Sequence, residues 1–362
     1  MFKRLFGNLF IGLYILLMIT IVDNIAYLLD EGKKSATVTK SLVSYSGDIV
    51  IPATVEHGGV EYVVNDILDE AFAGCAGLLS VVLGDNVESI GIGAFEECCA
   101  LGSVVFGNAV HLIGMRAFKG CAAIKEVVLP AGVLVIGREA FAGCRSLVNA
   151  YLSDNLINIE PSLFDGCSSL EKVSIGTMVE SVGEYAFCGC LSLKEIELPQ
   201  GVLSVEGWAF RDCTALENVV LPASLVSLKK GAFWGCSSLK EFALPLCVNM
   251  LDQGVLANCT SLGSVALHDG VLSIGYGAFY NCSSLESVTL PAAVVNVGDQ
   301  AFRSCKALKE IRVLCGAAPM CSADIADVDV YANTILRVPQ GCVGEYGFAR
   351  VWERFGNVEE IL

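Results

Sequence analysis

The sequence predicts an α/β repeat solenoid with coils of 23 residues, in which parallel β-strands stack on one face and short helical turns on the other. An aromatic position recurs every 23 residues without insertion or deletion, and a cysteine follows it each time after three residues. A fixed period of about 20 to 50 residues is typical of solenoids. The aromatic positions are Phe72, Phe95, Phe118, Phe141, Phe164, Phe187, Phe210, Phe233, Phe279 and Phe302, with Leu256 as the one exception. The cysteines are Cys75, Cys98, Cys121, Cys144, Cys167, Cys190, Cys213, Cys236, Cys259, Cys282 and Cys305.

The first predicted element of each coil is a short strand with one buried face. Each coil carries a pattern L-x-x-V-x-L after its phenylalanine, as in Leu193, Ile196 and Leu198. The alternation of apolar and polar residues at its end is typical of a half-buried strand. A proline such as Pro199 often ends the strand, because proline has no amide hydrogen to donate to the ladder.

The second predicted element is the opposite wall of the coil, followed by a turn. An apolar pair such as Val271 and Ile274 predicts the wall, and the Ala-Phe that follows predicts a tight helical turn that places the ring in the core. Two residues after the aromatic position stands glycine at several coils and aspartate or asparagine at others, as at Gly74 and Asn258. These residues tolerate positive φ, so we expect a left-handed backbone in this column.

The repeat resembles the BspA-like leucine-rich repeats, also called the Treponema pallidum type. The consensus L-x-x-V-x-L-P-x-x-V-x-x-I-G-x-x-A-F-x-x-C is spelled out from Leu193 to Cys213 and again from Leu285 to Cys305. The resemblance extends over about residues 36–362, and the segment from Tyr45 to Phe72 is similar to the opening segment of such proteins in Bacteroidetes-type bacteria. It implies a leucine-rich repeat fold and an exported, cell-surface or secreted protein. Some members of the family are adhesins that bind host proteins.

Four segments follow from these patterns. We expect a signal peptide or membrane anchor over 1–22, an N-terminal cap over 23–66, a solenoid of about eleven coils over 67–313 and a C-terminal cap over 314–362.

The first segment has Lys3 and Arg4 before an apolar run, which is the order of a signal peptide. No A-x-A cleavage site or lipobox cysteine follows, so an uncleaved anchor with membrane association stays open, although the resemblance favours a signal peptide. In the C-terminal cap, Tyr346, Trp352 and Phe355 are expected to cover apolar surface.

The net charge and the cysteines indicate which partners are excluded and which disulfides are expected. The net charge is −16, and no basic stripe is present to neutralise phosphates, so nucleic acid is excluded as a partner. The repeat cysteines are expected to be small buried apolar residues, because parallel stacking points the thiols the same way. Among the other cysteines, Cys315 and Cys321 are expected to form a disulfide.

No catalytic motif is found in the sequence. The three histidines, His57, His111 and His268, lie far apart and at different repeat positions, so they predict neither a triad nor a metal cluster. There is no phosphate loop and no Gly-x-Ser-x-Gly. We therefore expect a protein that is not an enzyme and that uses no cofactor.

Two groups of residues are candidates for ligand binding. Outward strand positions supply the first group, with Tyr151 as a possible aromatic anchor: Glu126, Tyr151, Lys172, Glu195 and Glu197. The turn edge supplies the second group on three successive coils: Tyr185, Trp208, Arg211 and Trp234. The alternative for the second group is packing over the outer wall. A third column, seven residues after the phenylalanine, alternates in charge from Glu171 to Lys240 and predicts an exposed charge ladder for solubility and register.

A regular solenoid surface without catalytic residues predicts a binding module. We expect adhesin-like recognition of a host or neighbouring-cell protein or glycan. The alternative is an envelope scaffold that associates with copies of itself.

Overall fold

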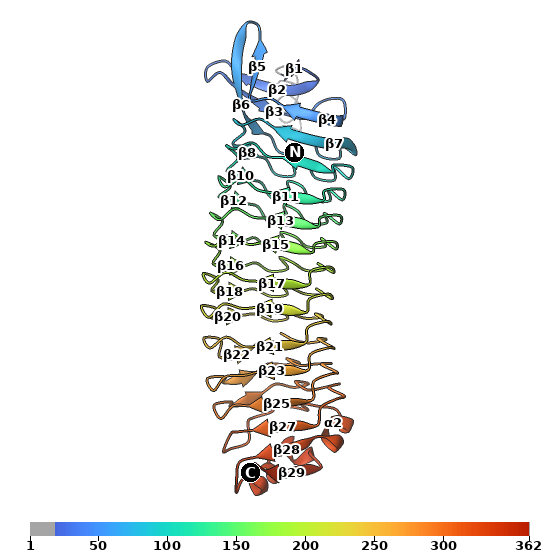
Figure 1. Ribbon diagram of the computed structural model, residues 1–362, viewed down its shortest axis with the longest axis vertical. Coiled ribbons are helices and arrows are strands. Elements are labelled where there is room, and N and C mark those ends of the chain that lie inside the picture. The colour runs from blue at the N-terminus through green and yellow to red at the C-terminus, as the bar shows by residue number, and fades with distance from the viewer. Residues whose placement is uncertain (1–18, 362) are drawn as a thin grey trace, which may run out of the picture. The chain divides into compact units, whose positions relative to one another are not determined.

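Each repeat forms two short strands. One lies at the V-x-L pattern, and the other lies at the end of the apolar pair that follows. The computed structural model describes residues 19–361 (Figure 1). The chain divides into two compact units, of which the first ends at Leu156 and the second begins at Ile157. The two units are described in turn.

The first unit begins with hairpin-like strands. β1 (Ile19–Val22), β2 (Ile25–Asp30) and β3 (Ser35–Val38) pair antiparallel in chain order, and β5 (Thr54–His57) pairs antiparallel with β6 (Val60–Ile67). β3 pairs with β6 in parallel, and this pair begins the parallel stack. The last four residues of the predicted segment 1–22 therefore form β1, whereas residues 1–18 lie outside the described residues.

Two ladders of parallel strands continue the first unit. The strands of the V-x-L pattern and their N-terminal neighbour are β4 (Ser46–Ile51), β7 (Gly77–Leu83), β9 (Ser103–Val105), β11 (Glu126–Val128) and β13 (Asn149–Tyr151). The strands of the second wall are β8 (Ser89–Ile90), β10 (Leu112–Ile113) and β12 (Val135–Ile136). Val81 pairs with Val104, so neighbouring coils are in register one period apart.

The second unit repeats this arrangement (Figure 1). Its V-x-L ladder is β15 (Lys172–Ser174), β17 (Glu195–Glu197), β19 (Asn218–Val220), β21 (Glu241–Ala243), β23 (Ser264–Ala266), β25 (Ser287–Leu290) and β27 (Glu310–Val313). Its second wall is β14 (Asn158–Ile159), β16 (Ser181–Val182), β18 (Ser204–Val205), β20 (Ser227–Leu228), β22 (Met250–Leu251), β24 (Ser273–Ile274) and β26 (Asn296–Val297). The parallel ladder runs past residue 313, because β28 (Ile335–Val338) and β29 (Asn357–Glu360) extend it from β27.

Helices are confined to the C-terminal part of the described chain. They are α2 (Val328–Asn333), α3 (Val343–Phe348) and the 3-10 turn η1 (Trp352–Arg354). None of the helices within residues 19–361 has the length and apolar content needed to cross a bilayer. Tyr346 of α3, Trp352 of η1 and the adjoining Phe355 are buried, in keeping with the expected role of covering apolar surface.

The helical turns predicted after the second wall are hydrogen-bonded turns instead, and residues 67–313, all described, contain no helix. The reason is the acceptor to which the backbone amide of the phenylalanine donates its hydrogen bond. In a helix it would donate to the carbonyl four residues earlier, but Phe95 N donates to Ala117 O of the next coil over 2.7 Å.

Left-handed residues bracket each of these turns. The column two residues after the phenylalanine is left-handed as predicted, from Gly74 (φ 72°) to Ser304 (φ 64°). A second left-handed column, two residues before the phenylalanine, was not predicted, and it includes Tyr185 (φ 57°) and Trp208 (φ 55°). Helix formation needs consecutive right-handed residues, so the two columns keep the turn short.

The core of each unit is a stack of rings and thiols. Phe95 and Phe118 stack with ring centroids 5.1 Å apart and a 3° angle between planes, and Phe210 and Phe233 do the same at 5.2 Å and 2°. The repeat cysteines are buried, as predicted, and none of them is joined in a disulfide.

The predicted disulfide between Cys315 and Cys321 is wrong, since both are free. The Cys315 thiol donates to the carbonyl oxygens of Pro291 and Val294, both over 3.2 Å, and the Cys321 thiol points to Pro319 O over 3.6 Å. The two sulfurs are therefore directed at different backbone carbonyls and not at each other.

Candidate binding surfaces

The outward side of the V-x-L ladder in the second unit forms an open groove over β15, β17 and β19. Strand alternation produces it, because Ile196 is buried between Glu195 and Glu197, which are both exposed. The groove has a volume of about 820 Å³. It brings together three of the predicted binding residues, Lys172, Glu195 and Glu197, with Asn218 and Val220 beside them in register.

The other two predicted strand residues lie on β11 and β13 of the first unit. Glu126 is exposed and pairs with Asn149, and the half-buried Tyr151 pairs with Val128. Tyr151 ends an outward column of exposed valines that the sequence reasoning missed: Val50, Val82, Val105 and Val128. The missed signal is the recurrence of valine ten residues after the phenylalanine of successive coils.

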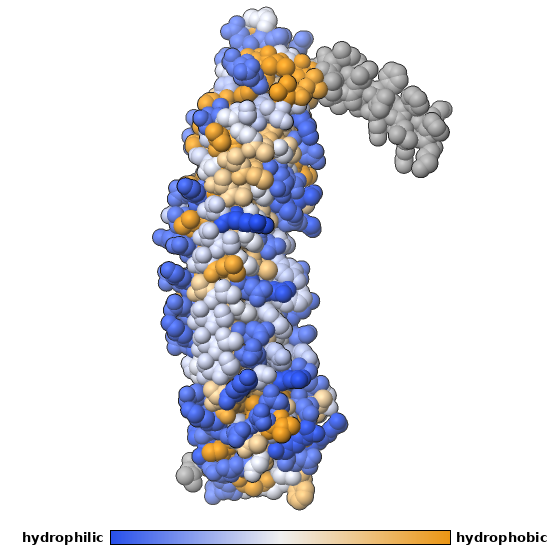
Figure 2. Space-filling view, turned by 90° about the vertical axis from the view of Figure 1, so that its right-hand side faces the viewer, coloured by the Kyte–Doolittle hydropathy of each residue, from blue (hydrophilic) through white to orange (hydrophobic). Residues whose placement is uncertain are grey.

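A second apolar surface lies at the start of the first unit. Figure 2 shows strongly apolar side chains gathered at the end of this unit that carries β1 and β4. The exposed residues Ile21, Val43 and Val50 line a hollow of about 440 Å³ there.

The predicted turn-edge residues come together in the second unit. Tyr185 and Trp208 stack with centroids 5.2 Å apart, and Trp208, Arg211 and Trp234 line a hollow of about 260 Å³. Lys230, which was not predicted, places its Nζ 4.2 Å from the centre of the Trp208 ring.

This patch also packs on the outer wall, because the three rings are half-buried. The indole of Trp208 lies against Gly231 of the next coil, where an added Cβ would be 2.4 Å from Trp208 Cδ1. Both roles considered from the sequence are therefore compatible with its geometry.

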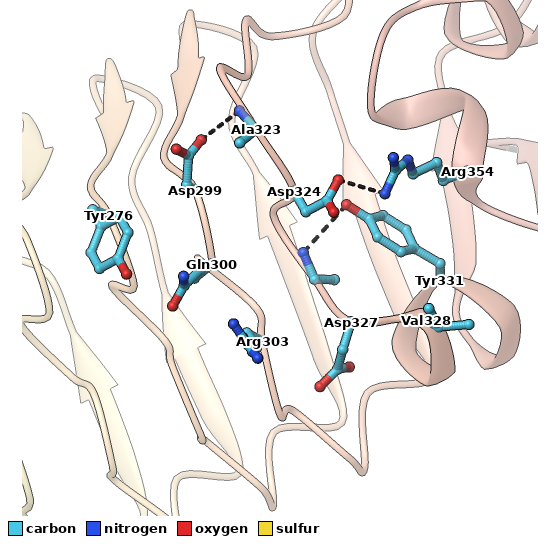
Figure 3. Close-up of a pocket in the computed structure, with 11 residues that line it drawn as sticks. Tyr276, Asp299, Gln300, Arg303, Ala323, Asp324, Asp327, Val328, Tyr331 and Arg354 are labelled. Atoms are coloured by element: carbon cyan, nitrogen blue, oxygen red, sulfur yellow. Dashed lines mark hydrogen bonds and ion pairs between the residues drawn. The ribbon is translucent and has the colours of Figure 1, made fainter.

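A further pocket, of about 400 Å³, lies where the last coils meet the C-terminal segment (Figure 3). Its lining includes Tyr276, Gln300, Arg303, Asp327 and Arg354, none of which was predicted. Part of the signal was present in the repeat, since Arg303 occupies the same column as Arg211 and Trp234.

The predicted charge ladder forms in part. Lys240 and Glu217 form a salt bridge of 2.6 Å, and Lys309 and Glu286 one of 2.9 Å. The hydrogen bond from Lys240 lowers the pKa of Glu217. These pairs are exposed, so they set register and solubility more than stability.

His111, His268 and Cys98 each lie within hydrogen-bond distance of a backbone carbonyl oxygen. Within residues 19–361, no group of three or more histidine, cysteine, aspartate or glutamate side chains is placed to hold a metal ion. The ring nitrogens of His111 and His268 lie within hydrogen-bond distance of backbone carbonyls, at 3.3 Å from Ala109 O and 2.9 Å from Val248 O. Burial raises the pKa of Cys98 to about 12, so this thiol carries no nucleophilic thiolate at neutral pH.

The chain is similar in structure to solved leucine-rich repeat proteins of bacteria. A leucine-rich repeat protein from Bacteroides ovatus is 26% identical, with a TM-score of 0.61, and the match covers 95% of this chain and 100% of that one. A leucine rich cell surface protein from Faecalibacterium prausnitzii is also 26% identical, with a TM-score of 0.48, over 82% of this chain and 94% of that one. None of the curated proteins compared with the chain matches it.

The family model described as "BspA type Leucine rich repeat region (6 copies)" matches residues 65–194 and 180–309. Together these ranges cover more than half of the 362 residues. The matched ranges contain the coils that form the two walls, the ring stack and most of the cysteine column described above. The chain belongs to the BspA-type leucine-rich repeat family.

Proposed function

We propose that this protein is an exported, non-enzymatic binding protein that recognises a protein or glycan ligand through its solenoid surface. The observation that carries the proposal is the groove over β15, β17 and β19. Its polar residues stand on strands whose backbone is fixed by pairing, so the spacing of these side chains is set before a ligand arrives and the backbone loses little entropy on binding.

The groove has mixed charge, which favours a polar ligand. Lys172 offers a donor, and Glu195 and Glu197 offer acceptors, over a distance of two coils. Val220 adds an apolar contact at the edge. A ligand that matches this pattern is a polypeptide loop or an oligosaccharide with spaced hydroxyl groups.

Export is supported by the sequence before β1. Lys3 and Arg4 precede an apolar run, and this order is that of a secretory signal or of an N-terminal anchor. Membership of the BspA-type family supports a place at the cell surface or outside the cell.

A binding screen with the purified full chain tests this function. We expect saturable binding to at least one member of a panel of extracellular-matrix proteins and glycans. The triple variant Lys172→Ala, Glu195→Ala, Glu197→Ala is expected to raise Kd at least tenfold. The control Glu286→Ala, Lys309→Ala removes an exposed charge pair outside the groove and leaves Kd unchanged. Equal affinity of the triple variant and the wild type would exclude the groove.

The second candidate function is an envelope scaffold that self-associates. The column Val82, Val105 and Val128 favours it, because an exposed apolar stripe is typical of an interaction surface. Light scattering separates the two functions. A scaffold would assemble with increasing concentration, and Val105→Lys with Val128→Lys would abolish the assembly. A chain that stays monomeric at all concentrations is not a scaffold of this kind.

A further inference from the structure

The pocket at the C-terminal end of the second unit has a rigid rim (Figure 3). Asp299 Oδ1 accepts hydrogen bonds from Ser322 Oγ and Ala323 N, both over 2.7 Å. The Arg354 guanidinium forms a salt bridge of 2.5 Å with Asp324. These bonds fasten the segment 322–327 to the last coil on one side and to η1 on the other.

Tyr331 of α2 holds the same rim through its hydroxyl group. Its hydroxyl oxygen accepts hydrogen bonds from Ile325 N over 3.1 Å and from Ala326 N over 3.3 Å. Three backbone amides of the segment that bounds the pocket, those of Ala323, Ile325 and Ala326, are therefore satisfied. Such a rim needs little reorganisation when a ligand binds.

Other polar groups of the pocket are not used by the protein itself. Among the described residues, no side-chain hydrogen bond or ion pair is found for the Tyr276 hydroxyl, the Gln300 amide or the Arg303 guanidinium. Asp327 receives bonds from Ser304 through Oδ2, at 3.1 Å from the backbone nitrogen, so its Oδ1 is available. In Figure 3 these four side chains lie along one side of the pocket.

The free groups define the chemistry of the ligand. The guanidinium only donates hydrogen bonds, the carboxylate only accepts them, and the amide and the hydroxyl do both. A partner with several hydroxyl groups, each a donor and an acceptor, satisfies all four. The ring of Tyr276 is 46% exposed and adds a flat apolar face.

We propose that this pocket binds a neutral sugar, the end residue of an oligosaccharide or a free saccharide, with Tyr276 as the platform and Gln300, Arg303 and Asp327 as hydrogen-bonding groups. The volume of about 400 Å³ lies in the range of small-molecule sites, roughly 300–1,000 Å³. The pocket is separate from the strand-face groove, so this proposal is tested independently of the proposed function.

The charges of the lining disfavour ionic ligands. Three carboxylates, of Asp299, Asp324 and Asp327, face two guanidiniums, of Arg303 and Arg354. An anion meets an excess of negative charge, and a cation meets the guanidinium of Arg303, which has no carboxylate partner among the described residues. A neutral polyol avoids both costs.

Saturation-transfer NMR with the full chain tests the proposal. The probes are the methyl glycosides of glucose, galactose, mannose and N-acetylglucosamine, with sialic acid as an anionic competitor and glycine as a zwitterionic competitor. We expect transfer to at least one neutral glycoside, reduced at least fivefold in Tyr276→Ala and in Arg303→Gln. Circular dichroism confirms that each variant is folded.

Two matched controls report on specificity. Tyr280→Ala removes a second tyrosine of the same coil that does not line the pocket, and Arg312→Ala removes an arginine of β27. Both are expected to keep the full signal. The proposal is overturned by transfer to none of the four glycosides, by equal signals in Tyr276→Ala and wild type, or by preference for sialic acid or glycine.

Discussion

The thiol of Cys213 donates a hydrogen bond of 3.1 Å to the carbonyl oxygen of Phe187, 26 residues earlier in the chain. The backbone amide of Cys190 donates to the same oxygen over 3.2 Å. One carbonyl thus joins a turn to the next coil, and the bond recurs from Cys98 to Cys305. The cysteine column is therefore a ladder of weak hydrogen bonds in addition to a packing column.

Loss of this thiol is expected to destabilise the second unit. Cys213→Ala removes a buried sulfur and its hydrogen bond, and we expect the free energy of unfolding to fall by about 1–2 kcal/mol. Urea denaturation measures this loss of unfolding free energy. The control is Cys247→Ala, an exposed cysteine outside the ladder, which should change stability by less than about 0.5 kcal/mol. Equal effects of the two substitutions would contradict a role for the ladder.

Two adjacent cysteines are expected to differ in reactivity. Burial raises the pKa of Cys98 to about 12, and the side chain is covered, whereas Cys99 is exposed. Iodoacetamide at pH 7.5 should therefore modify Cys99 and leave Cys98 intact in the native protein, as read by mass spectrometry of the shared peptide. Modification of both in urea is the control. Native modification of Cys98 at the rate of Cys99 would contradict the buried ladder.

Gly231 is expected to be required for the position of Trp208. A methyl group there would meet the indole at 2.4 Å, so Gly231→Ala should displace the ring and shift tryptophan fluorescence. Gly189→Ala is the matched control, because Gly189 has the same left-handed backbone (φ 69°) and its nearest contact is an ordinary 3.7 Å. We expect Gly231→Ala to destabilise the protein more than Gly189→Ala. Equal effects would show that backbone strain alone explains the cost.

The period allowed the sequence to predict the features that each coil repeats. Two strands per coil, the ring at Phe95 and the left-handed residue at Gly74 follow from columns that recur every 23 residues. The turn was predicted as helical because Ala-Phe-x-x-Cys is compatible with one helical turn. In the structure the backbone amide of Phe95 donates its hydrogen bond to the next coil. That bond depends on the stacking of the coils and not on the local sequence.

The sites were only partly predictable for the same reason. Lys172, Glu195 and Glu197 share outward columns, so stacking brings them together as the repeat predicts. The C-terminal pocket joins Tyr276 of a coil to Arg354 of the cap. No periodicity relates these two residues, so only the folded cap reveals their proximity.

Acid is expected to weaken the first unit through Glu139. The hydrogen bond from Lys119 Nζ, at 2.6 Å, lowers the pKa of this carboxyl below its ordinary value of 4.5. Because the folded-state pKa is depressed, the stabilisation is present above about pH 4.5 and is lost as the pH falls through the lower folded-state value.

Thermal melts from pH 7 to pH 3 measure this effect. Glu139→Gln should be less stable than the wild type at pH 7 and should lose less stability on acidification. The matched control is Glu61→Gln, at an exposed position of β6. An unchanged pH dependence in Glu139→Gln would show that other carboxyls control the acid transition.

The end of the ladder is expected to depend on one indole hydrogen bond. Trp352 is fully buried, its Nε1 donates to Pro319 O over 2.7 Å, and its ring packs edge-on against Tyr346 at 5.8 Å. Trp352→Phe keeps an aromatic ring but leaves that carbonyl only the weak contact of the Cys321 thiol at 3.6 Å. We expect a loss of about 1–3 kcal/mol of unfolding free energy.

The partner substitution distinguishes a cap that acts as a unit from two independent bonds. Tyr346→Phe removes the bond from the Tyr346 hydroxyl to Cys315 O, which measures 2.9 Å. Both bonds fasten the cap to the segment 315–319, so once one is lost, the second has less ordered backbone to hold. The double variant should therefore lose less free energy than the sum of the single variants. Strict additivity in urea denaturation would mean that the two side chains fasten the cap separately. A loss of unfolding free energy below roughly 0.5 kcal/mol for Trp352→Phe, the size of an ordinary surface substitution, would mean that ring packing alone stabilises this end of the ladder.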